Sequence, residues 1–178
     1  MTEASEDLWV FGYGSLMWRP GFDYIERRAG LVRGYHRALC VYSFHHRGTP
    51  QEPGLVMGLD RGGSCRGAAF RVAAGKRADT IAYLREREQV TGVYLERSAA
   101  ATLDNGQTVP ALVYVVDRRH EQYAGRLDVD AVVAIVRRGR GVSGYNPDYV
   151  RNTQSHLVEM GVHDPWLTQV VNRLDQEF

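Results

Sequence analysis

Segments with strand character fill the first two thirds of this chain, and three of its four predicted helices come after them. Apolar runs bounded by turn residues predict strands at 8–13, 31–43, 55–59, 66–72, 92–103 and 107–116. Turn-forming residues at 60–64 and 104–106 predict two hairpins, which join neighbouring strands antiparallel. Antiparallel strands with helices grouped late indicate an α+β fold.

Helical periodicity covers residues 77–89, and the first residues of three later helices are also recognisable. The candidate N-caps are Asp128, Asn146 and Asp164, the last two followed by proline at the first helical position. We therefore expect helices over 129–138, from 146 to about 161, and from 164 onward.

Length, charge and cysteine content narrow the class of protein. The 178 residues predict a single domain over 1–178, with 1–7 as a flexible N-terminal extension. A net charge of +1 argues against nucleic-acid binding, and no apolar run reaches the roughly 20 residues of a membrane-spanning helix. Cys40 and Cys65 form no metal-binding motif, which favours a cytoplasmic protein without a metal. Nothing in the sequence specifies an oligomeric state.

The first strand leads directly into Gly12-Tyr13-Gly14-Ser15-Leu16. Glycines on both sides of Tyr13 permit a sharp turn and a close approach to the main chain. Successive N–H groups of Gly14, Ser15 and Leu16 can form an arc that receives a carboxylate or an oxyanion. Spacing alone also fits an ordinary strand end, so both interpretations stay open here.

Glu88 is the candidate catalytic group. A step of about 100° per residue places it within roughly 40° of Ile81 and Leu84 around the helix axis, whereas Glu86 lies about 160° away. Glu88 therefore shares the apolar face. A carboxylate there either pairs with an arginine or lies in a cavity where desolvation raises its pKa.

Several segments together resemble the ChaC family, the glutathione-specific γ-glutamylcyclotransferases, and the resemblance extends from residue 8 to about 161. They are WVFGYGSL at 9–16, HRGTP at 46–50, Pro53-Gly54, Arg87-Glu88, Gly92-Val93-Tyr94, and SGYN at 143–146 with Tyr149. The resemblance implies a γ-glutamylcyclotransferase-like fold: a small, curved, mostly antiparallel β-barrel with peripheral helices. It also implies a carbon–nitrogen lyase that converts glutathione to 5-oxoproline and Cys-Gly without metal or organic cofactor.

The same resemblance implies a role for each site residue. Glu88 would be the general acid and base, and the loop from Tyr13 to Leu16 would hold the γ-glutamyl portion of the substrate. Tyr149 would donate its hydroxyl to the substrate, unless it is a helix tyrosine packed on the core. Arg47 is either the ligand of the glycyl carboxylate or an exposed loop residue.

The expected chemistry needs no enzyme nucleophile, because the α-amine of a γ-glutamyl group can reach its own γ-carbonyl carbon. Ser15 is therefore not expected to act as one. The segment 87–94 resembles the bacterial branch, and Asp79 stands where some members carry a second glutamate. Two alternatives follow: a cyclotransferase for other γ-glutamyl peptides or amines, and a glutathione-binding module without turnover.

Overall fold

The computed structural model describes residues 6–89 and 92–176. The chain divides into two compact units, the first from Met1–Arg37 with Leu59–Asp117, the second from Ala38–Gly58 with Arg118–Phe178. The single domain over 1–178 stays a prediction. Most of the expected flexible extension lies outside the described residues, but the Asp7 carboxylate accepts hydrogen bonds from Arg71 Nε at 2.8 Å and from the Ala74 N–H at 2.9 Å.

The secondary structure follows the predicted order of strands before helices. The elements are β1 (Leu8–Gly12), η2 (Ser15–Met17), β2 (Glu26–Ser43), β3 (Gly54–Val72), η3 (Ala74–Lys76), α1 (Arg77–Glu88), β4 (Tyr94–Leu103), β5 (Thr108–Val116), α2 (Val129–Arg138), β6 (Arg140–Gly141), β7 (Gly144–Tyr145), α3 (Asn146–Glu159) and α4 (Pro165–Leu174). Here η denotes a 3-10 helix.

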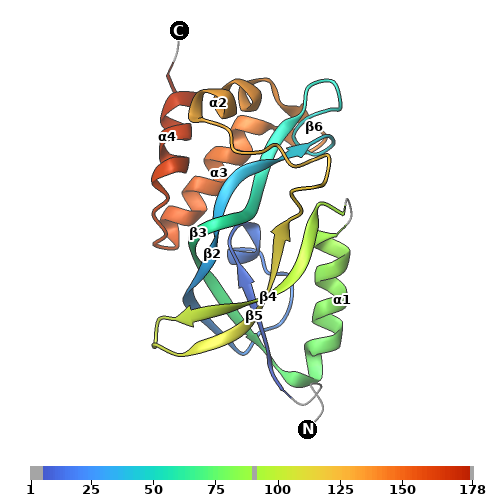
Figure 1. The fold of residues 1–178 in the computed structure, drawn as a ribbon, viewed down its shortest axis with the longest axis vertical. Coiled ribbons are helices and arrows are strands. Elements are labelled where there is room, and N and C mark those ends of the chain that lie inside the picture. The colour runs from blue at the N-terminus through green and yellow to red at the C-terminus, as the bar shows by residue number, and fades with distance from the viewer. Residues whose placement is uncertain (1–5, 90–91, 177–178) are drawn as a thin grey trace. The chain divides into compact units, whose positions relative to one another are not determined.

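Strands β1 to β5 close into a barrel with the order β1-β3-β2-β4-β5 (Figure 1). β1 runs antiparallel to β3 and parallel to β5, and β4 runs antiparallel to β5. All five residues of β1 are buried, as expected for a strand that is apolar without alternation. The predicted α+β class and the mostly antiparallel barrel are confirmed.

One predicted hairpin is wrong and the other is confirmed. Residues 60–64 form no turn; they lie inside β3, a continuous strand of 19 residues. Gly62 and Gly63 have φ values of +104° and +69°, which glycine adopts without steric cost, so the strand can bend there and continue. The turn at 104–106 does join β4 to β5, with the Leu103 N–H donating to the Gln107 carbonyl at 2.8 Å. The six expected strands thus become five barrel strands and the short β6–β7 pair within the described residues.

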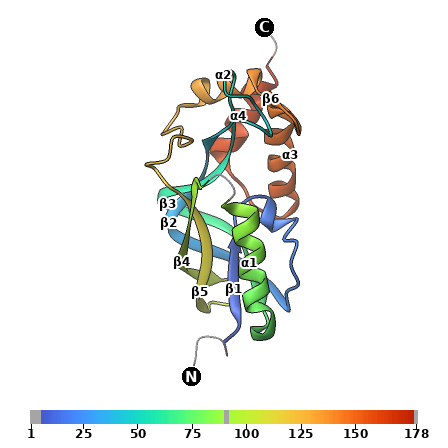
Figure 2. The same cartoon turned by 90° about the vertical axis from the view of Figure 1, so that its right-hand side faces the viewer.

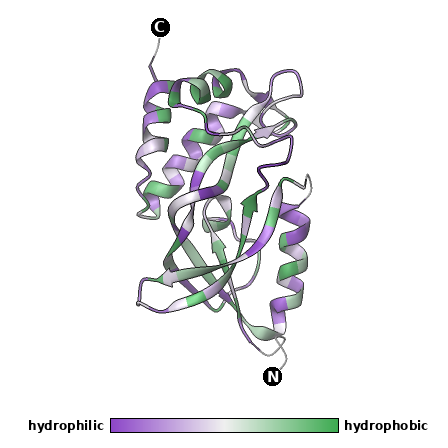
Figure 3. Ribbon diagram, viewed as in Figure 1, coloured by the Kyte–Doolittle hydropathy of each residue, from purple (hydrophilic) through white to green (hydrophobic). Residues whose placement is uncertain are grey.

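Helix α1 packs on the barrel through its apolar face. Leu84 is fully buried in a cluster with Leu8 and Val10 of β1, Leu16 of η2, Val72 and Tyr114. Figure 2 shows α1 alongside β1, and in Figure 3 α1 is mostly hydrophilic with isolated hydrophobic residues. This packing holds the last turns of α1 and the segment after β1 against one core.

In the second unit, α2, α3 and α4 pack against one another (Figure 1). Asp128 and Asp164 cap α2 and α4 as predicted, each accepting a hydrogen bond from an N–H three residues ahead. Asn146 is not the cap of α3, because the helix begins after Tyr145. The Asn146 side chain instead pairs with the main chain of Leu55, accepting from its N–H and donating to its carbonyl, both at 2.8 Å.

Substituting Asn146 tests this pairing. Asn146→Ala leaves a buried donor and a buried acceptor of Leu55 without partners, and each such group costs about 1–3 kcal/mol. We expect the free energy of unfolding in urea to fall by at least about 2 kcal/mol. Asn152→Ala, at an exposed position of the same helix, is the matched control and should change it little. Equal stability of the two variants would contradict the structural role of Asn146.

Candidate functional site

The turn after β1 leads into η2 and leaves three consecutive N–H groups outside the bonding pattern of that helix. A Cβ added to Gly12 would lie 2.9 Å from Leu16 Cβ, so close packing requires glycine there. At Gly14 nothing lies within 4 Å of the added Cβ. The first hydrogen bond of η2 runs from the Met17 N–H to the Gly14 carbonyl, at 2.9 Å. The helix therefore does not use the N–H groups of Gly14, Ser15 and Leu16.

A buried arginine fixes this turn. Arg37 Nε donates to the Tyr13 carbonyl at 2.6 Å, and Arg37 Nη2 donates to the Arg66 carbonyl at 2.6 Å. Because C=O and N–H of a trans peptide point in opposite directions, this bond turns the Gly14 N–H away from Arg37. Sequence reasoning missed Arg37. The alternation of β2 could have revealed it. Arg37 lies two and four residues before Leu39 and Val41, so it shares their face of the strand, which is buried and where a charged side chain is unusual.

Glu88 is the last residue of α1, and its side chain is only 16% exposed, whereas Glu86 is exposed. The predicted helix face is therefore confirmed. Burial raises the pKa of Glu88 above its ordinary value of 4.5, and the Arg87 guanidinium partly opposes this rise. Arg87 Nε lies 3.5 Å from Glu88 Oε1. The carboxylate is thus desolvated, as one sequence alternative expected, and also lies beside an arginine, as the other expected.

Tyr114 of β5 is a second polar group within electrostatic reach of Glu88. Its hydroxyl donates to Glu96 Oε1 at 2.8 Å, and Arg85 donates to both oxygens of Glu96 at 3.0 Å. Burial above all, then the bond to Glu96, raises the pKa of Tyr114 far above its ordinary value, and the Glu88 charge adds to the rise. Tyr114 therefore stays neutral. The sequence shows no pattern that distinguishes it from other strand tyrosines.

Arg47 and Tyr149 meet in the second unit. Arg47 Cζ lies 5.5 Å from the centre of the Tyr149 ring, and Arg47 Nη1 donates to the Tyr145 carbonyl at 3.1 Å. The Tyr149 hydroxyl accepts a hydrogen bond from the Met57 N–H at 3.0 Å. Both side chains are partly exposed. The substrate-binding roles of Arg47 and Tyr149 stay predictions.

The structure thus distributes the predicted site residues over both units. Tyr13, Gly14, Ser15, Leu16 and Glu88 belong to the first unit, and Arg47 and Tyr149 belong to the second. Asp79 is exposed in the first turn of α1. The loop after Glu88, part of the segment 87–94 that resembles the bacterial branch, includes residues 90 and 91, which lie outside the described residues.

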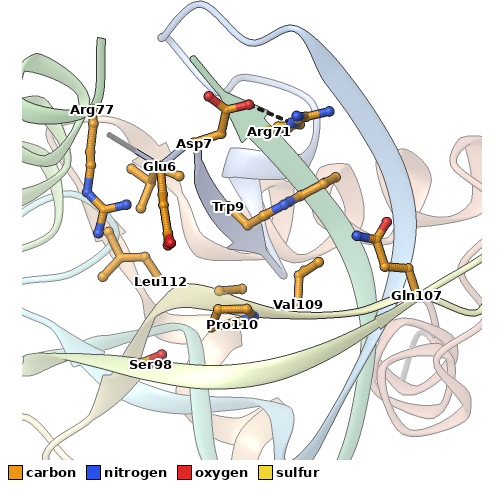
Figure 4. Close-up of a pocket in the computed structure, with 12 residues that line it drawn as sticks. Glu6, Asp7, Trp9, Arg71, Arg77, Ser98, Gln107, Val109, Pro110 and Leu112 are labelled. Atoms are coloured by element: carbon orange, nitrogen blue, oxygen red, sulfur yellow. Dashed lines mark hydrogen bonds and ion pairs between the residues drawn. The ribbon is translucent and has the colours of Figure 1, made fainter. Parts of the chain in front are cut away.

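A separate pocket of about 740 Å³ lies in the first unit (Figure 4). Its lining includes Trp9 of β1, Val109 and Pro110 of β5, and the ion pair of Asp7 with Arg71 at 2.8 Å. None of the predicted site residues lines it. The pocket is therefore distinct from the candidate site at Glu88.

Residues 6–89 and 92–176 contain no group of three or more His, Cys, Asp or Glu side chains that could hold a metal ion. In the same part of the chain, no helix combines the length and apolar character needed to cross a membrane.

The family model and similar curated proteins point to the same family. The chain matches the ChaC-like protein family over residues 8–177. It is 33% identical over 164 residues to the glutathione-specific γ-glutamylcyclotransferase of Escherichia coli strain K12, covering 92% of this chain and 71% of that protein. It is 36% identical over 147 residues to the human glutathione-specific γ-glutamylcyclotransferase 1, covering 80% of this chain and 66% of that protein.

A solved structure supports the fold. The yeast γ-glutamyl cyclotransferase specific to glutathione superimposes with a TM-score of 0.84 at 21% identity, covering 95% of this chain and 96% of that chain. The expected γ-glutamylcyclotransferase-like fold is therefore confirmed. Because the family match takes in residues 8–177 and the Escherichia coli relative shares 33% identity, the chain belongs to the ChaC-like family.

Proposed function

We propose that this protein is a carbon–nitrogen lyase that converts glutathione to 5-oxoproline and Cys-Gly, with Glu88 as general acid and base. The names of its curated relatives support the reaction. The observation that supports the role of Glu88 is its burial: the carboxylate is 16% exposed and its pKa is raised by desolvation. A cytoplasmic location stays a prediction.

The proposed reaction is internal to the substrate. The α-amine attacks the γ-carbonyl carbon, a new C–N bond closes the five-membered lactam, and the bond to the cysteine nitrogen breaks. On becoming the lactam N–H, the α-ammonium nitrogen gives up two protons, and the cysteine nitrogen gains two on leaving as an ammonium. Glu88 accepts protons from the first nitrogen and returns them to the second. An α-ammonium has a pKa of about 8. A glutamate whose pKa is raised therefore accepts its proton more readily than a glutamate at the ordinary value of 4.5.

The N–H groups of Gly14, Ser15 and Leu16 would receive either the substrate carboxylate or the oxygen of the reacting carbonyl. Ser15 is not proposed as a nucleophile, because its hydroxyl accepts a hydrogen bond from Arg87 Nη2 at 3.0 Å. Arg47 and Tyr149 remain proposed substrate ligands, Arg47 through charge-assisted bonds to a carboxylate and Tyr149 through its hydroxyl.

Turnover of glutathione tests the proposal directly. The purified protein should release 5-oxoproline and Cys-Gly from glutathione, measured by chromatography of both products. Glu88→Gln should lower kcat at least about 100-fold, because general acid–base catalysis contributes about 10²–10⁴ in rate. Glu86→Gln, the same change on the exposed face, should retain wild-type activity. Full activity of Glu88→Gln would exclude Glu88 as the catalytic residue.

The buried carboxylate also predicts a dependence of stability on pH. Because the folded-state pKa of Glu88 lies above its ordinary value of 4.5, the folded protein binds more protons than the unfolded chain between these two pKa values. The contribution of Glu88 to stability is therefore present below pH 4.5 and lost as pH rises through the folded-state pKa. We expect Glu88→Gln to have a higher Tm than wild type at pH 7, with the difference disappearing at pH 4. A lower Tm at pH 7 would show that the carboxylate is stabilising.

A second candidate function is cyclotransfer on other γ-glutamyl peptides or amines. The observation in its favour is Asp79, which is exposed and stands where some family members carry a glutamate, a difference that would alter substrate selectivity. Competition of glutathione with γ-glutamyl-alanine and γ-glutamyl-lysine separates the two, and we expect kcat/KM to favour glutathione at least about tenfold. Equal or reversed preference would assign the broader substrate class. If calorimetry shows that glutathione binds but no product forms, the protein is a glutathione-binding module without turnover.

A further inference from the structure

Arg87 makes a set of contacts that the proposed mechanism does not use. Its guanidinium donates to the Ser15 hydroxyl at 3.0 Å and to the carbonyls of Arg19 and Pro20 at 2.7 and 3.1 Å. A further bond to the Tyr83 hydroxyl, at 3.2 Å, lies one turn back on α1. The side chain is 21% exposed. One planar guanidinium thus connects the C-terminal end of α1 with the start and the end of the segment 15–20.

Close packing also holds the residues directly after the segment 15–20 against α1. A Cβ added to Gly21 would lie 2.0 Å from the Tyr83 hydroxyl oxygen, so no side chain fits between the loop and α1 there. The rings of Phe22 and Tyr83 meet edge to face with their centres 6.5 Å apart. The contacts of Arg87 therefore continue a tight interface toward Ser15 and the N–H groups.

The charge of Arg87 is directed mainly at the loop and not at Glu88. Its bonds to the loop oxygens have hydrogen-bond lengths, whereas its Nε lies 3.5 Å from Glu88 Oε1, beyond a normal hydrogen bond. The carboxylate oxygens of Glu88 are thus not consumed by a short bond to Arg87. Such an arrangement is expected of a residue that orients neighbouring groups, because it leaves the Glu88 carboxylate able to accept a proton.

We propose that Arg87 is a positioning residue, which fixes the N–H groups of residues 14–16 relative to the Glu88 carboxyl by joining the segment 15–20 to the end of α1. The inference rests on the proposed function of Glu88. In a reaction that depends on attack geometry, a displacement of about 1 Å can cost about 100-fold in rate. A lysine cannot replace this arginine fully, because one ammonium cannot reproduce the planar fork.

Kinetics of Arg87→Ala, Arg87→Lys and the control Arg33→Ala test the proposal, since Arg33 is exposed on β2 of the same unit. We expect Arg87→Ala to lower kcat at least about 30-fold with a smaller change in KM, and Arg87→Lys to fall between it and wild type. Added methylguanidinium should restore part of the Arg87→Ala activity, and methylammonium should not. Retention of kcat within about twofold, or a loss seen only in KM, would overturn the proposal.

A double-mutant cycle with Ser15→Ala tests the link itself. The single Ser15→Ala change removes one of the Arg87 bonds, so it should lower kcat less than Arg87→Ala does. In the Arg87→Ala background it should have almost no further effect. Additive losses would show that Ser15 and Arg87 act independently and would contradict the proposed link.

Amide hydrogen exchange gives a readout that does not need turnover. Exchange at residues 15–19 should be at least about tenfold faster in Arg87→Ala than in wild type, and unchanged in Arg33→Ala. If the wild-type protein does not turn over glutathione, the proposed function fails, while this measurement still decides whether Arg87 orders the segment. Unchanged exchange in Arg87→Ala would overturn the positioning role.

Discussion

The packing of Leu84 against Leu8, Val10 and Leu16 is the interaction on which the candidate site of the first unit depends. One buried leucine of α1 shares a hydrophobic cluster with residues of the strand that ends in the glycine turn and of the short helix that follows it. One turn later on the same helix face is Glu88. The hydrophobic core therefore determines both where the N–H groups lie and where the carboxylate lies, although neither takes part in the core.

Arginines that bind main-chain carbonyls hold the glycine-rich turn in place. Arg37 binds the Tyr13 carbonyl on one side of the turn, and Arg87 binds the carbonyls of Arg19 and Pro20 on the other. A turn with glycine on both sides of Tyr13 has little conformational restriction of its own. The charged hydrogen bonds supply the restriction from outside, and they leave the N–H groups of residues 14–16 outside the helix bonding pattern.

The environment of Glu88 balances stability against reactivity. Burial of a carboxylate is unfavourable and raises its pKa, and the adjacent guanidinium of Arg87 reduces this effect without a short hydrogen bond. Tyr114, kept neutral by burial and by its bond to Glu96, adds no second negative charge beside it. The fold thus tolerates a desolvated base, because its stability comes from the apolar contacts of α1 with the barrel.

The sequence alone determined what is local and periodic. The hairpin at 104–106, the caps Asp128 and Asp164 and the apolar face shared by Leu84 and Glu88 follow from spacing and turn chemistry, and the joint motifs indicated the family. Tertiary structure decided the rest. Gly62 and Gly63 suit a bent strand as well as a turn, and only the place of β3 between β1 and β2 in the closed barrel selects the strand. The main-chain groups that the side chains of Arg37, Arg87 and Asn146 bind are 20 or more residues away in the chain, so no local pattern specifies them. These hydrogen bonds exist only once the fold brings those carbonyls and N–H groups close.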